Sequence, residues 1–81
     1  MNLHFGKMPI SALERTRCYV EEAKELIALQ NARIEALEKK GFPTEKSFAL
    51  LRTMKATLKL FRQEVERLED EEKSINKFKA P

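Results

Sequence analysis

Few side chains of the kinds used in catalysis are present, and they are scattered along the chain. His4 is the only histidine and Cys18 the only cysteine among the 81 residues. A general base needs a partner within hydrogen-bonding reach, and a reactive thiol needs an electropositive neighbourhood. Only Arg15 and Arg17 lie near Cys18 in the sequence. We therefore interpret His4 as an ordinary exposed side chain and Cys18 as a structural or incidental thiol.

The residue spacings that hold metals or phosphates do not occur in the sequence. It has no cluster of cysteines and histidines with zinc-binding spacing and no Glu-x-x-His repeat of the di-iron bundles. It also has no glycine-rich loop that could cradle a phosphate. We therefore predict no catalytic, cofactor-binding or metal-binding residue, and we expect a protein that is not an enzyme and needs no cofactor.

The composition fits one small folded domain. Hydrophobic residues make up 42% of the chain and charged residues 36%, and the hydrophobic residues recur too regularly for a disordered chain. No apolar run approaches the roughly 18 residues of a membrane span, and the first residues lack the apolar stretch of a signal peptide. A single cysteine forms no internal disulfide. We expect a soluble, cytoplasmic protein.

The strongest candidate for a binding motif is a row of four basic residues, which we call the basic stripe: Arg52, Lys55, Lys59 and Arg62. Their spacing of three, four and three residues places them on one face of a helix, where they could line up phosphates of RNA or DNA. No aromatic residue interleaves them for base stacking, and the net charge is only +3. We favour a solvated face with some ion pairing. A nucleic-acid-binding hairpin, similar in outline to plasmid-encoded RNA-modulating hairpin dimers, is the alternative. We expect no membrane binding, because the stripe does not flank a fully exposed, bulky apolar face.

Helix signals divide the chain in two. Ser11 and Glu14 have the spacing of a capping box, and Gly41 can adopt the left-handed conformation that ends a helix in a Schellman motif. Thr44 is a suitable N-cap for a second helix. We therefore predict an all-α, antiparallel two-helix hairpin in a single domain. Its segments are an N-terminal arm at 1–10, helices at 11–40 and 45–78, and a hinge at 41–44.

Hydrophobic periodicity indicates how the two helices meet. The short hinge makes them antiparallel, and we call their predicted contact the seam. Folding about Gly41 places Leu37 near Phe48, Ile34 near Leu51, Ile27 near Leu58, Ala23 opposite Phe61 and Val20 opposite Val65. Gln30 lies in this seam. One buried polar residue in such a contact more often fixes register or partner than binds a ligand.

The hydrophobic surface is wider than one seam requires. Six residues extend it to one side, and we call them the apolar face: Tyr19, Leu26, Leu29, Leu50, Thr57 and Leu60. An apolar surface that extends beyond the seam on one side only is typical of a second interface. We expect a homodimer that forms a four-helix bundle. A different protein partner is one alternative. The other is a monomer whose arm covers the face with Leu3, Phe5, Met8 and Ile10.

Charge predicts an orientation for this dimer. The segment 33–62 around the hinge carries eight basic and three acidic residues, a net charge of +5, whereas the rest of the chain has a net charge of −2. An antiparallel dimer would set each basic half beside the acidic half of the other chain. We therefore expect the two hinges to lie at opposite ends of the dimer.

The middle of the chain resembles a set of small α-helical hairpin proteins of proteobacteria, particularly of rhizobia, which have no assigned activity. The residues that carry the resemblance are Ile27, Gln30, Arg33, Ile34, Leu37, Glu38, Gly41, Thr44, Leu50, Leu51, Thr53, Met54, Thr57 and Leu58. The chain departs from the pattern at 42–43 and 47–48, where such proteins have smaller or more polar residues. The resemblance implies the hairpin fold and a bacterial origin. It implies no catalytic or binding residue.

Overall fold

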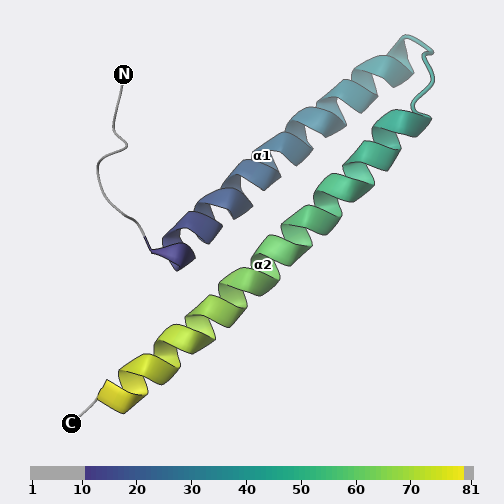
Figure 1. Ribbon diagram of the computed structural model, residues 1–81. Helices are drawn as coiled ribbons and strands as arrows, with labels where there is room; N and C mark the ends of the chain where they lie inside the picture. The colour runs from purple at the N-terminus through teal and green to yellow at the C-terminus, as the bar shows by residue number, and fades with distance from the viewer. Residues whose placement is uncertain (1–10, 80–81) are drawn as a thin grey trace, which may run out of the picture.

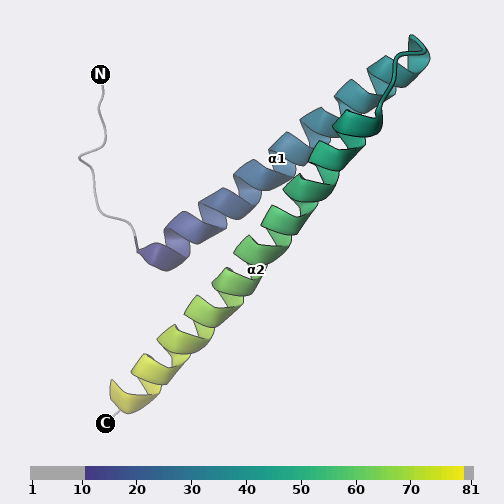
Figure 2. The ribbon, with the colours of Figure 1, turned by 45° about the vertical axis from the view of Figure 1, so that its right-hand side comes forward.

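The structure is a hairpin of two long helices. The computed structural model describes the backbone of residues 11–79 and the side chains of residues 11–75. Helix α1 spans Ala12–Lys39 and helix α2 spans Glu45–Lys79, and the two lie side by side and antiparallel (Figures 1 and 2). The predicted all-α hairpin is confirmed. The predicted arm at 1–10, with the four apolar residues that could cover the apolar face, lies outside the described residues.

The start of α1 is fixed by the predicted capping box. The Ser11 hydroxyl accepts a hydrogen bond from the backbone N–H of Glu14 at 3.0 Å, and the Glu14 carboxylate accepts one from the backbone N–H of Ser11 at 3.1 Å. Ser11 itself is extended, with φ −65° and ψ 161°. The helix therefore begins at Ala12, one residue later than predicted, because the capping residue does not adopt helical angles.

The end of α1 is a Schellman motif, as predicted. The N–H of Phe42 donates to the carbonyl of Leu37 and that of Gly41 to the carbonyl of Glu38, each at 3.0 Å. Gly41 has a φ of +76°, which a residue without a Cβ adopts at little cost. Lys40 is the C-cap, so α1 ends at Lys39, one residue earlier than predicted.

The beginning of α2 follows directly from this turn. The carbonyl of Thr44 accepts the first bond of the helix from the N–H of Phe48 at 2.9 Å, as expected of an N-cap residue. The helix continues to Lys79, one residue beyond the predicted end. With 28 residues in α1 and 35 in α2, the second helix extends past the start of the first at the end away from the hinge (Figure 1).

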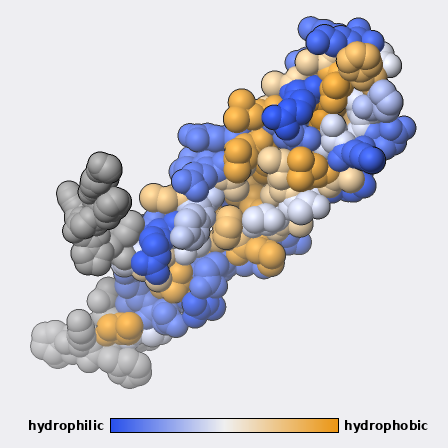
Figure 3. Space-filling model, turned by 45° about the horizontal axis from the view of Figure 1, so that its top comes forward, coloured by the Kyte–Doolittle hydropathy of each residue, from blue (hydrophilic) through white to orange (hydrophobic). Residues whose placement is uncertain are grey.

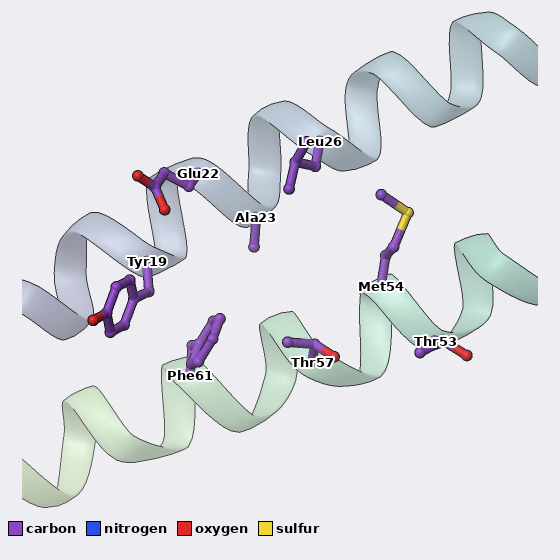
Figure 4. A pocket seen from close by; sticks show the side chains of 8 residues that line it. All are labelled: Tyr19, Glu22, Ala23, Leu26, Thr53, Met54, Thr57 and Phe61. Carbon is purple, nitrogen blue, oxygen red and sulfur yellow. The ribbon is translucent and has the colours of Figure 1, made fainter.

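The contacts between the helices agree only in part with the predicted register, because Tyr19 pairs with Phe61 and Gln30 bonds to Ser47, each more than one helical turn nearer the hinge along α2 than that register places them. Ile27 and Leu58 line one groove together, as predicted, whereas in Figure 4 Ala23 faces the gap between Phe61 and Thr57 and Tyr19 lies beside Phe61. Further towards the open end, a guanidinium nitrogen of Arg17 on α1 lies 2.7 Å from a carboxylate oxygen of Glu69 on α2. The hinge thus sets the relative position of the helices along their whole contact.

The core that this contact creates is small. Among the described residues only three apolar side chains are buried: Leu13, Ile34 and Leu51. Two polar residues are buried with them. The Thr16 hydroxyl donates to the carbonyl of Ala12 at 2.8 Å, and Gln30 bonds across the seam. Two helices share a single interface, so the hairpin leaves most of its apolar side chains at the surface.

Candidate interaction surface

All six residues predicted to form the apolar face are exposed. Leu29 and Leu60 retain 63% of their accessible surface, Leu26 retains 52%, and Tyr19, Leu50 and Thr57 are also exposed. Figure 3 shows hydrophobic residues gathered along one face of the two helices, with hydrophilic residues bordering them. Five large apolar side chains are thus exposed together on this face, in addition to the buried and half-buried ones of the seam.

A groove runs between the helices on this side of the molecule. Its volume is about 210 Å³. Figure 4 shows why it exists: Ala23 presents only a methyl group to α2, between Phe61 and Thr57, whereas larger side chains project from both helices around it. The lining residues are Tyr19, Glu22, Ala23, Leu26, Thr53, Met54, Thr57 and Phe61.

An aromatic pair closes one end of the groove. The ring centroids of Tyr19 on α1 and Phe61 on α2 are 5.5 Å apart, with their planes tilted by 36°. This separation lies within the range in which aromatic pairs attract one another. The pair holds the two helices together across the groove and leaves part of Tyr19 at the surface.

The six residues of the apolar face belong to two parallel rows. On α1 the row runs through Tyr19, Glu22, Leu26 and Leu29, and on α2 it runs through Leu50, Thr53, Thr57 and Leu60. Each row has the three- and four-residue steps of one helical face, and both include residues that line the groove. The apolar face is therefore one surface contributed by both helices.

Sequence reasoning missed some residues of this surface. Glu22, Thr53 and Met54 line the groove but were not among the predicted interface residues. Sequence spacing could have identified two of them as part of this surface, because Glu22 and Thr53 lie within the two rows of the apolar face. Met54 follows the periodicity of the seam, and only the tertiary structure shows that it also borders the groove.

Beyond Leu60, the row on α2 continues as a cluster of ion pairs. Arg67 donates hydrogen bonds to Glu64 at 2.7 Å and to Glu71 at 3.0 Å. The hydrogen bond from Arg67 and its positive charge hold the pKa of Glu64 below the ordinary value of 4.5, and the same contacts raise the pKa of Arg67. Both side chains are solvent-accessible, so the cluster organises charge at the surface rather than in a core.

The basic stripe lies partly in a second, shallower groove. Lys55, Lys59 and Arg62 line it beside Ile27 and Leu58, whereas Arg52 does not. None of the four basic residues forms an ion pair with another residue in the described part of the chain, so the expected ion pairing is not observed. Their cationic groups are open to solvent.

No family model, no curated protein and no solved structure matches this chain. The resemblance to the proteobacterial hairpin proteins therefore stays a prediction from the residues that carry it.

The structure describes Cys18 but not His4, the other side chain considered for chemistry. Cys18 is exposed, as expected for the outer side of α1, and His4 lies outside the described residues. Over residues 11–79, no group of three or more histidine, cysteine, aspartate or glutamate side chains could hold a metal ion. Neither helix, as far as it is described, combines the length and apolar character that crossing a membrane requires.

Proposed function

We propose that the protein is a cytoplasmic, non-enzymatic interaction or regulatory module, and that it acts through the apolar face. The observation that carries this proposal is the distribution of its apolar side chains. Three are buried among the described residues, whereas eight large ones are at least 39% exposed. Five of these eight belong to the apolar face: Tyr19, Leu26, Leu29, Leu50 and Leu60.

Covering the exposed side chains of the apolar face would release free energy of burial. Covering a fully exposed leucine side chain contributes about 1.5–3 kcal/mol. Leu29 and Leu60 are the most exposed of these side chains at 63% each, and they stand on different helices, each in a row that also contains residues lining the groove. A contiguous patch of this kind, bordered by charged residues, is typical of a surface that a protein partner covers.

A photo-reactive amino acid at position 29 tests whether a protein covers the face. We expect illumination in the producing cells to yield covalent adducts with protein at position 29. The matched control is position 31, because Asn31 is exposed and lies against a different groove, away from the apolar face. Equal adduct formation at both positions, or none at position 29, would contradict the proposal.

A second candidate function is nucleic-acid binding through the basic stripe. It is supported by the convergence of Lys55, Lys59 and Arg62 on one open groove without a carboxylate partner among the described residues. Contacts of this type depend steeply on salt, because each phosphate that is neutralised releases a counterion.

Fluorescence anisotropy with labelled RNA and DNA duplexes tests this candidate. If it holds, affinity falls as salt is raised and is lost in the double variant Lys55→Gln/Lys59→Gln. The control is Lys39→Gln/Lys40→Gln, which makes the same change of charge at the hinge. Absence of binding at low salt, or equal loss in both variants, would exclude a specific role for the stripe.

A further inference from the structure

The charged residues that border the apolar face form a regular pattern. On α1, Glu22 precedes Leu26 by four residues and Arg33 follows Leu29 by four. On α2, Lys46 precedes Leu50 by four residues and Glu64 follows Leu60 by four. Steps of four keep all of these residues on the same side of their helices as the apolar face.

The pattern separates the charges by sign along the hairpin. Arg33 and Lys46 border the apolar face towards the hinge. Towards the open end, Glu22 lies within the row between Leu26 and Tyr19, and Glu64 follows Leu60. Glu22, Arg33 and Lys46 are exposed, and Glu64 is partly exposed. The guanidinium of Arg33 also donates a hydrogen bond to the side-chain oxygen of Gln30 at 3.0 Å, which restricts its position at the edge of the seam.

On each helix, the two oppositely charged residues lie at equal distances along the sequence from the middle of the apolar face. Midway between Glu22 and Arg33 lies the pair Leu26 and Leu29, and midway between Lys46 and Glu64 lies the pair Thr53 and Thr57. The two midpoints lie at nearly the same level of the hairpin, because Leu26, Thr53 and Thr57 line the same groove. One two-fold axis across the face would therefore pass near both.

We propose, building on the function proposed above, that the apolar face is covered by a second copy of this chain in antiparallel orientation. Each helix then lies against the same helix of the other copy, reversed in direction. Glu22 meets Arg33 of the other copy, and Lys46 meets Glu64. Between them Leu26 meets Leu29, and Leu50 meets Leu60.

The opposite orientation would bring like charges together. With both hinges at the same end, α1 of one copy would lie against α2 of the other at the same level. Arg33 would then lie near Lys46 of the other copy, since Arg33 bonds to Gln30 and Gln30 bonds to Ser47, the residue after Lys46. Juxtaposed like charges oppose association, so the charge pattern selects the antiparallel orientation.

The mass in solution, measured by sedimentation equilibrium, tests whether a second copy of the chain covers the apolar face. We expect the wild type to have twice the 9.5 kDa mass of one chain, and Leu26→Glu to have the mass of one chain. Far-ultraviolet circular dichroism of Leu26→Glu, set against the wild type at concentrations below its dissociation constant, shows whether the single hairpin stays helical.

Charge reversal tests the orientation. In Arg33→Glu and in Glu22→Arg, both Glu22–Arg33 ion pairs of the antiparallel dimer become repulsive, and we expect each dissociation constant to rise about tenfold. The double variant Arg33→Glu/Glu22→Arg restores both pairs and should dimerise like the wild type. Because it also lacks the contact of Arg33 with Gln30, its recovery excludes a fold defect as the cause. Lys55→Glu makes the same change of charge as Arg33→Glu outside the apolar face and should leave the dimer unchanged.

The outcomes separate this inference from the proposed function. A wild-type protein that is monomeric at tens of micromolar would overturn the proposal that a second copy covers the apolar face. Adducts at position 29 in cells would still support an interaction surface. A dimer that Leu26→Glu leaves intact would overturn the use of this face for self-association. Sensitivity to Leu26→Glu without sensitivity to charge reversal would overturn the antiparallel pairing.

Discussion

The side-chain amide of Gln30 donates a hydrogen bond to the main-chain carbonyl of Ser47 at 2.9 Å, linking the interior of α1 to the first turn of α2. Gln30 is the most buried of the described residues, at 2% of its accessible surface. Its oxygen accepts the hydrogen bond from Arg33, so both ends of the amide are satisfied. This side chain acts as a clip between the helices close to the hinge.

The hydrogen bond between Gln30 and Ser47 predicts that Gln30 contributes to the register of the two helices as well as to the stability of the hairpin. We expect Gln30→Ala to lower the free energy of unfolding by about 1–3 kcal/mol, since it removes buried volume and both hydrogen bonds. Gln30→Leu should recover most of this loss but give more than one set of amide resonances, because an apolar seam permits alternative registers. Urea unfolding and amide NMR spectra measure the two effects. A single sharp set of resonances in Gln30→Leu would show that other residues fix the register.

Substitution of Gly41 is expected to destabilise the hinge through its backbone conformation and not through a steric clash. A Cβ placed on Gly41 meets no atom within 4 Å, but its φ of +76° lies in the left-handed region. We expect Gly41→Ala to destabilise the hairpin by about 1 kcal/mol and Gly41→Asn by less, because asparagine tolerates this conformation better. Thermal unfolding of both variants checks the order. Equal stability of Gly41→Ala and the wild type would show that the turn relaxes to another conformation.

The ion pair between Arg17 and Glu69 predicts a measurable coupling between the helices. It lies towards the open end, where both side chains are partly exposed. A double-mutant cycle with Arg17→Ala and Glu69→Ala should give a coupling of about 0.2–1 kcal/mol that falls at high salt. The same cycle on Lys24 and Glu21, a pair within α1, serves as the control for a local contact. A coupling that does not depend on salt would argue against an electrostatic origin.

The contact between Glu64 and Arg67 predicts that pH affects stability locally, through ionisation of the Glu64 carboxyl. Because the pKa of Glu64 is lowered in the folded state, its contribution to stability is present at neutral pH and is lost as the pH falls below the ordinary value of 4.5. Carbon-detected NMR titration of the Glu64 carboxyl should give a pKa below that of an unfolded chain. We expect Arg67→Gln to raise this pKa, and Arg52→Gln, which changes an arginine elsewhere on α2, to leave it unaltered. An unchanged pKa in Arg67→Gln would contradict the assignment of the cause.

The helices and their ends could be predicted because local interactions encode them. Ser11 and Glu14 satisfy one another within a single turn, and Gly41 ends α1 through bonds to carbonyls of the preceding turn. The antiparallel direction followed from the short hinge. The register followed only in part, because Tyr19 meets Phe61 and Gln30 meets Ser47 rather than residues further from the hinge. The boundaries differed by one residue where a capping residue was counted as helical.

The groove could be predicted only in part. The spacing of the apolar residues identified the face, and Ala23 was already expected opposite Phe61. The open volume at that position depends on how far apart the two backbones lie and on the rotamers of Tyr19 and Met54, which periodicity does not encode.

By itself the sequence determined two helices, their caps, their direction and the side on which excess apolar residues lie, since each depends on residues close together in the chain or on a simple period. The tertiary structure decided which groups meet across the hairpin: Gln30 with Ser47, Arg17 with Glu69, and Tyr19 with Phe61. Those contacts depend on side-chain reach and rotamer over a separation of many residues. A pattern read along one helix therefore leaves them open until the two helices are placed together.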